Sequence, residues 1–192
     1  MLSKSAQAGM HKYAERQADL YETPACAVEA LLRVESVPYL VWEPACGPGA
    51  IVKVLRAQGH EVFPSDVVDY GWGHEVRDFF SSSHPYAQMP PTAIVTNPPY
   101  QEAARFVRWA LQNSSYVAML LRLAFLESEG RSDILDEHPP ARIHVFKKRL
   151  PMMHRAGWKG KKASSAIAFA WFVWDGSVSW PKGPGGTIID RI

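Results

Sequence analysis

Asn97, Pro98, Pro99 and Tyr100 carry the groups best suited to chemistry in this chain of 192 residues. They follow the apolar run 93–95, so we expect them where a strand ends. Asn97 offers a side-chain carbonyl and Tyr100 an aromatic face, while the prolines stiffen the loop and leave its carbonyls as acceptors. An exocyclic amine that donates to Asn97 Oδ1 and the Pro98 carbonyl would lose conjugation with its ring and become nucleophilic. The alternative is an ordinary proline-rich turn after a strand.

A second segment predicts a ligand-binding turn between a strand and a helix. The β-favouring run 40–42 precedes Gly47 and Gly49, and apolar residues at helical spacing follow over 51–55. Glycines let the backbone approach a ligand, and a helix N-terminus offers free N–H groups. Glu43, at the expected strand end, favours a cationic amine over a pyrophosphate as the group bound there.

Asp66 and Val67 follow this turn at the distance where dinucleotide-binding folds place a ribose-binding acid, about 20 residues on. We therefore expect the Asp66 carboxylate to bind ribose hydroxyls. The alternative is a solvated acid at the end of a strand.

These segments resemble the amino-methyltransferases that use S-adenosylmethionine (SAM), above all DNA adenine-N6 methyltransferases of the small phage or prophage type. The resemblance covers most of residues 20–175 and implies a catalytic loop formed by Asn97, Pro98, Pro99 and Tyr100. It implies that residues 21–24 cover the methionine end of SAM and that residues 78–79 contact its adenine. The implied cofactor-binding residues are Tyr21, Thr23, Pro24, Glu43, Pro44, Ala45, Cys46, Gly47, Gly49, Asp66, Val67, Asp78, Phe79 and Asn97.

Several of these residues also have purely structural interpretations. Thr23 and Pro24 suit a helix start, with threonine as N-cap and proline at the first helical position. Phe79 suits a hydrophobic core, and the small side chain of Cys46 suits packing within the loop.

Residues 147–162 form a basic stretch without acids. Basic and aromatic residues together suit phosphate contacts and stacking on unpaired bases, whereas the alternative is a solvated surface loop. The predicted nucleic-acid contacts are Lys147, Lys148, Arg149, Arg155, Trp158, Lys159, Lys161 and Lys162. No Cys/His metal spacing appears, so we predict no catalytic metal.

Helical and strand patterns alternate along the chain, which predicts an α/β fold with a Rossmann-like sheet, mostly parallel and wound on both sides. Helices are expected near 25–34, 49–58, 102–112 and 131–137, and strands near 39–45, 61–65, 92–96, 116–121, 142–146 and 166–174. The last strand is expected to pair antiparallel near one edge. Ligands bind beyond the carboxyl ends of such strands, so Gly47 and Asn97 should meet there.

The chain length fits a single domain, expected over residues 21–180, with an N-terminal arm at 1–20 and a flexible tail at 181–192. Hydrophobic residues make up 47% of the chain, which argues against disorder, and no apolar run is long enough to cross a membrane. The two cysteines form no disulfide framework, and no secretory signal is recognisable, so we expect a cytoplasmic protein. Either a monomer or a homodimer is consistent with the sequence.

The resemblance implies methyl transfer from SAM to the N6 amine of adenine in DNA. Sequence-specific members carry a separate target-recognition domain, for which this chain offers no segment, so low intrinsic sequence specificity is expected. The main alternative is RNA adenine; guanine in RNA and the glutamine amide of release factors use the same loop. Cytosine-N4 enzymes more often have serine at the position of Asn97. A non-catalytic nucleic-acid-binding protein on the same scaffold is the alternative from a different class.

Overall fold

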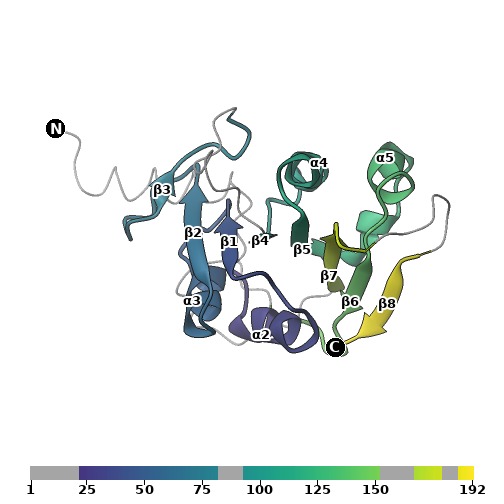
Figure 1. The fold of residues 1–192 in the computed structure, drawn as a ribbon, viewed down its shortest axis with the longest axis horizontal. Coiled ribbons are helices and arrows are strands. Elements are labelled where there is room, and N and C mark those ends of the chain that lie inside the picture. Colours follow the sequence, from purple (N-terminus) through teal and green to yellow (C-terminus); the bar gives the residue numbers. More distant parts are fainter. Residues whose placement is uncertain (1–21, 82–92, 152–166, 179–185) are drawn as a thin grey trace.

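The computed structural model describes residues 22–81, 93–151, 167–178 and 186–192. The helices are α2 (Ala25–Val34), α3 (Ala50–Ala57), α4 (Ala103–Asn113) and α5 (Ser132–Leu135), with short 3-10 turns at Leu123–Leu126 and Glu129–Arg131. The strands are β1 (Leu40–Glu43), β2 (Glu61–Asp66), β3 (Glu75–Val76), β4 (Ala93–Thr96), β5 (Tyr116–Arg122), β6 (Arg142–Val145), β7 (Phe169–Asp175) and β8 (Ile188–Arg191). Helices α2 and α3 lie on one side of the sheet, and α4 and α5 lie on the other (Figure 1).

The eight strands form one sheet in the order β3-β2-β1-β4-β5-β7-β6-β8. All neighbouring strands pair in parallel except β7, which runs antiparallel to both β5 and β6. The predicted α/β class, with a mostly parallel sheet and an antiparallel strand near one edge, is therefore confirmed.

The core has two halves because the central strands are buried on both faces. In β5, Ala118 and Leu120 pack with the α2 and α3 side, and Met119 and Leu121 pack with the α4 side. This alternation follows from the period of two of a β-strand. A strand buried on both faces reads as a continuous apolar run, which is why 116–121 was recognisable in the sequence.

The parallel register brings the two predicted segments to the same edge of the sheet. Trp42 in β1 pairs with Ile94 in β4, so the chain leaves both strands at their carboxyl ends, side by side. Glu43 ends β1, and Asn97 directly follows β4.

Two strands were not predicted. Strand β3 is only two residues long, and β8 lies within 181–192, where a flexible tail was expected. For residues 188–191 that prediction was wrong, because the Ile188 N–H donates to the Ala141 carbonyl at 3.0 Å and the Ile192 N–H donates to the Val145 carbonyl at 3.0 Å. Backbone pairing with β6 orders this segment although its side chains are exposed.

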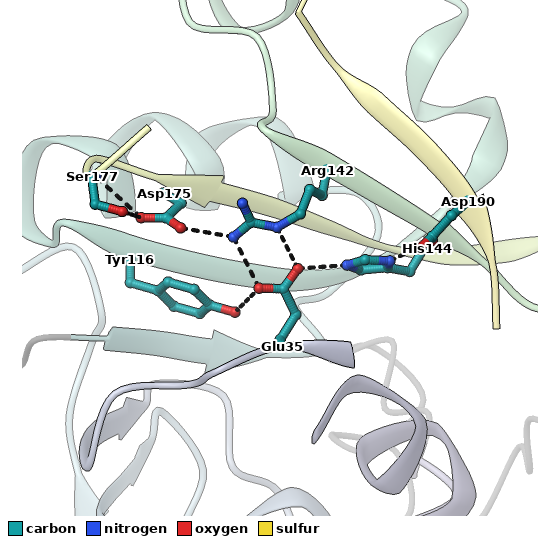
Figure 2. A network of polar contacts seen from close by, with 7 residues as sticks. All are labelled: Glu35, Tyr116, Arg142, His144, Asp175, Ser177 and Asp190. Atoms are coloured by element: carbon teal, nitrogen blue, oxygen red, sulfur yellow. Dashed lines mark hydrogen bonds and ion pairs between the residues drawn. The ribbon is translucent and has the colours of Figure 1, made fainter. Parts of the chain in front are cut away.

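A buried polar network fastens β8 to the rest of the fold (Figure 2). Glu35, directly after α2, is 8% exposed and binds both Arg142 and His144 of β6. The other ring nitrogen of His144 lies 2.5 Å from Asp190 Oδ1 in β8, and the Tyr116 hydroxyl donates to Glu35 Oε2 at 3.0 Å. The network thus connects α2 and β5 with both β6 and β8.

Candidate active site

A cavity of about 410 Å³ opens at the carboxyl ends of β1, β2 and β4. Its volume lies within the range of small-molecule sites, about 300–1,000 Å³. Both predicted segments contribute to its wall. The predicted site residues that line it are Thr23, Glu43, Pro44, Ala45, Cys46, Gly47, Asp66, Val67, Asp78, Phe79, Asn97 and Pro99.

Other predicted residues stand apart from this cavity. Pro24, Gly49, Pro98 and Tyr100 do not line it, and Tyr21 lies outside the described residues. The wall also contains residues that the sequence analysis did not single out. These are Glu22, Pro48, Ala50, Ile51, Tyr70, Arg77, Phe80, Gln101, Glu102, Arg105 and Phe106. Most of them directly adjoin a predicted residue, and this proximity was the available signal.

Trp72 covers the glycine turn and was also missed. Its indole Nε1–H donates to the Gly47 carbonyl at 2.8 Å. Gly49 has φ +83°, and a Cβ there would lie 3.1 Å from the Trp72 ring. Gly49 is therefore required both by its left-handed backbone and by the indole packed against it. The ring of His74 stacks on Trp72 with centroids 5.0 Å apart.

Asp66 ties the glycine turn to the end of β2. Its Oδ2 accepts from the Gly47 N–H at 2.9 Å, and its Oδ1 accepts from the Val68 N–H at 3.0 Å. Burial raises the pKa of Asp66, and the two hydrogen bonds offset only part of that effect. Each carboxylate oxygen can accept a second hydrogen bond, so Asp66 can shape the turn and still bind a ligand hydroxyl.

Glu43 presents an unsatisfied carboxyl group at the bottom of the cavity. It is 2% exposed, and its Oε2 has no hydrogen-bond partner among the residues that the structure describes. Burial, and then the charge of Asp66, raise the pKa of Glu43 well above its usual value, against a weaker effect of the Val52 backbone. A buried carboxylate is costly unless it is paired, so this site favours a ligand with a positive charge.

Thr23 orients the amide of Asn97. The Asn97 Nδ2–H donates to Thr23 Oγ1 at 3.0 Å, which fixes the amide plane and turns its oxygen away from the threonine. The prediction of Thr23 as N-cap was wrong. Helix α2 starts at Ala25 with Pro24 as its N-cap and has no side-chain cap, because the Thr23 hydroxyl is engaged by Asn97 instead.

Phe79 serves both the core and the cavity. Its ring lies 5.2 Å from Trp42, 4.6 Å from Phe106 and 4.4 Å from Trp109 between centroids, and the residue is 3% exposed. The neighbouring Asp78 accepts from the Phe80 N–H at 3.0 Å and lines the same wall. The core interpretation of Phe79 therefore holds together with its place in the cavity wall.

Tyr100 turns away from the cavity wall toward the α2 side of the core. Its ring lies 5.6 Å from that of Phe169, and the guanidinium carbon of Arg122 lies 4.2 Å from its centroid. Of the predicted nucleic-acid contacts, Lys147, Lys148 and Arg149 are exposed beyond β6. The others, Arg155, Trp158, Lys159, Lys161 and Lys162, lie outside the described residues.

Within the described part of the chain, no three His, Cys, Asp or Glu side chains are grouped closely enough to bind a metal ion. No helix found there combines the length and apolar character needed to cross a membrane.

Solved structures with the same fold are methyltransferases. A provisionally assigned RNA methyltransferase from Pyrococcus horikoshii is 14% identical with a TM-score of 0.55, covering 81% of this chain and 87% of that one. A type I restriction-modification methyltransferase subunit from Streptococcus thermophilus is 11% identical with a TM-score of 0.53, covering 86% and 47%. The 23S rRNA methyltransferase ErmE is 17% identical with a TM-score of 0.52, covering 80% and 68%.

At these identities the likeness shows the fold alone. No protein-family model matches the sequence, and no curated protein sequence matches it. The chain therefore has a methyltransferase fold, built around a cavity that holds Glu43, Asp66 and Asn97.

Proposed function

We propose that this protein transfers a methyl group from SAM to the exocyclic N6 amine of adenine in DNA. One observation carries the proposal: the amide of Asn97, oriented by Thr23, shares a cavity wall with two buried acids, Glu43 and Asp66. A methyltransferase fold with a positioned amide acceptor beside an acid-lined cavity suits methylation of an amine.

The cavity fits SAM group by group. Glu43 would pair with the cationic methionine end, because its carboxyl group is buried and its Oε2 lacks a partner among the described residues. Asp66 would accept from the ribose hydroxyls. Val67, an apolar residue that is 67% exposed at the cavity wall, and Phe79 would contact the adenine of the cofactor.

The catalytic loop, residues 97–100, would prepare the substrate amine. SAM, when bound, supplies an electrophilic methyl group. Asn97 Oδ1 and the Pro98 carbonyl accept the two amine hydrogens, which leaves the nitrogen lone pair free to attack. No covalent enzyme intermediate is required, and the rate would come from positioning and preorganised acceptors. A duplex target would have to be flipped out of the helix.

A nucleic-acid substrate is supported by the exposed cations Lys147, Lys148 and Arg149, which follow β6. RNA adenine is the second candidate, because two of the solved structures described above are assigned to RNA methylation. The resemblance of the catalytic loop to small phage DNA enzymes favours DNA.

The decisive experiment measures transfer of labelled methyl from SAM to duplex DNA, single-stranded DNA, tRNA and a protein mixture in parallel. Label in the N6 position of DNA adenine supports the proposal. Label only in tRNA would establish the RNA alternative, and no transfer to any acceptor would support a non-catalytic role.

Replacing Asn97 tests the proposed chemistry. Asn97→Ala removes an acceptor, so we expect kcat to fall by roughly 10²–10³, as for the loss of one oxyanion-hole donor, while SAM still binds. Asn113→Ala is the matched control, because this asparagine bonds the Trp109 carbonyl within α4 and does not line the cavity. Near-normal turnover of Asn97→Ala with SAM bound would refute the assignment.

A further inference from the structure

Two arginines lie over aromatic rings on the same side of the molecule's sequence order, just after β5, but their surroundings differ. The guanidinium carbon of Arg131 is 4.5 Å from the Phe125 centroid, and its Nη1 donates to the Phe125 carbonyl at 2.7 Å. The guanidinium carbon of Arg122 is 4.2 Å from the Tyr100 centroid. Its Nε is buried and has no hydrogen-bond partner among the described residues. Arg131 is thus anchored by backbone, whereas Arg122 keeps unused donor capacity.

Arg122 lies beside the catalytic loop but outside the cavity. It ends β5, next to β4, and pairs across the sheet with Phe169, which also contacts Tyr100. Asn97 and Pro99 line the cavity, while Tyr100 and Arg122 do not. Arg122 therefore flanks the loop where it turns from the cavity toward the α2 side of the core.

The ring of Tyr100 is the surface on which a flipped base is expected to stack, and Arg122 covers it. A guanidinium and a nucleobase can both occupy an aromatic face, by cation–π contact or by stacking, at comparable strength. An arginine displaced from the ring carries five donors and no acceptor, which suits a phosphate contacted by two parallel hydrogen bonds.

We propose that Arg122 binds a backbone phosphate of the substrate strand and, in the free protein, occupies the Tyr100 face that the target base takes. This inference rests on the proposed function and deepens it, since it restricts the substrate to a phosphate-bearing strand and disfavours a glutamine amide. The exchange satisfies the buried Nε of Arg122 only when substrate is bound.

The test measures binding of a short, fluorescent single-stranded oligodeoxynucleotide with one adenine, in the presence of S-adenosylhomocysteine, over a range of salt concentrations. Arg122→Gln should weaken binding about tenfold, the effect of losing one charge-assisted contact. The slope of log affinity against log salt should become shallower by about 0.7, the value for one phosphate on a single strand. Arg131→Gln, the matched control, should keep the wild-type slope.

A neutral methylphosphonate at the phosphates flanking the adenine provides the second arm. It should weaken wild-type binding about as much as Arg122→Gln does, and it should cost the Arg122→Gln variant little more, because both changes remove the same contact. Arg122→Lys should retain most of the salt slope, since its charge remains. Unchanged affinity for S-adenosylhomocysteine will show that the variants fold, because Arg122 does not line the cavity.

The outcomes separate this inference from the proposed function. Losses that simply add, or an Arg122→Gln slope equal to that of the wild type, would overturn the role of Arg122 even if methyl transfer to DNA is observed. Failure of the wild type to bind the oligonucleotide would overturn it as well. Absence of methyl transfer to any nucleic acid, with the salt and methylphosphonate effects intact, would instead refute only the proposed reaction.

Discussion

The carboxyl group of Glu43 determines how the empty cavity should respond to a cation. Burial keeps its pKa well above the ordinary value of 4.5, so the group holds its proton over a wider pH range than an exposed glutamate. A cationic ligand group favours the carboxylate and lowers that pKa again. Ligand binding is therefore coupled to the release of a proton.

We expect SAM binding to release protons at pH values below the raised pKa of Glu43, and its affinity to increase with pH up to that point. Calorimetric titration in buffers with different ionisation enthalpies measures the proton count directly. Glu43→Gln should bind SAM more weakly and without the pH dependence. Proton release that persists in Glu43→Gln would assign the effect to another group, with Asp66 the nearest candidate.

At the same scale, Thr23 shows what single residues hide in a sequence. Its hydroxyl was expected to cap a helix or contact the cofactor, yet it holds Asn97, a residue 74 positions away. The direction in which the catalytic amide points is thus set by the segment before α2 and not by the loop itself.

Among the elements, the turn between β1 and α3 depends on the indole packed against it. Gly49→Ala introduces a left-handed alanine, which costs about 1–2 kcal/mol, and brings a Cβ to 3.1 Å from Trp72. Gly71→Ala is the matched control, because φ there is +72° and nothing lies within 4 Å of the added carbon. We expect Gly49→Ala to lower the free energy of unfolding more than Gly71→Ala, by about 1 kcal/mol or more, in urea titrations.

Only the Gly49 variant should also weaken SAM binding, since Trp72 is bonded to Gly47 in the cavity wall. Equal losses of stability in the two variants would mean that the ring moves aside without cost.

The attachment of β8 to β6 should depend on pH through His144 (Figure 2). Burial lowers the pKa of this imidazole, but its hydrogen bonds to Glu35 and Asp190 outweigh that effect, so the pKa lies above 6.5. Its contribution to stability is complete below pH 6.5 and is lost as the pH rises through the raised value. Burial also disfavours the Glu35 carboxylate, yet His144 and Arg142 hold its pKa below 4.5, so its contribution is lost only as the pH falls through that lowered value.

We therefore expect the backbone amides of Ile188 and Ile192 to be best protected from hydrogen exchange between about pH 4.5 and 6.5. Above that window their exchange, corrected for the intrinsic rate, should accelerate. His144→Gln should flatten the alkaline side of the profile. His60→Gln should leave it intact, because the His60 ring contacts the Pro38 carbonyl and no carboxylate. An unchanged profile in His144→Gln would exclude His144 as the titrating group.

For the whole molecule, the elements with strong local signals were predictable from the sequence. The run 116–121 is buried on both faces, and the glycine turn follows a β-favouring stretch, so β5 and the β1–α3 unit lie close to their expected positions. The meeting of Gly47 and Asn97 followed from the rule for the carboxyl ends of parallel strands. The contacts of Trp72 with the turn and of β8 with β6 could not be predicted, because both depend on pairing between segments that no local pattern connects.

The absence of a recognisable target-recognition segment in the printed sequence bears on the whole molecule's selectivity. If DNA adenine is the substrate, we expect methylated sites to share a context of only a few bases, because the described fold is fully used in forming the sheet and the cavity. Sequencing that detects modified adenines, applied to genomic DNA treated with the protein and SAM, measures this context. A long and strictly defined recognition sequence would contradict the expectation.

The insertion of β7 between β5 and β6 has a consequence for synthesis on the ribosome. Every residue that lines the cavity, from Glu22 to Phe106, is translated before β6, and β6 pairs only with strands that are translated after it. A nascent chain could therefore assemble the cavity half of the sheet early, while β6 waits for residues 169–175 to emerge. Ribosome-bound chains arrested before and after β7 should differ in protease resistance mainly around β6.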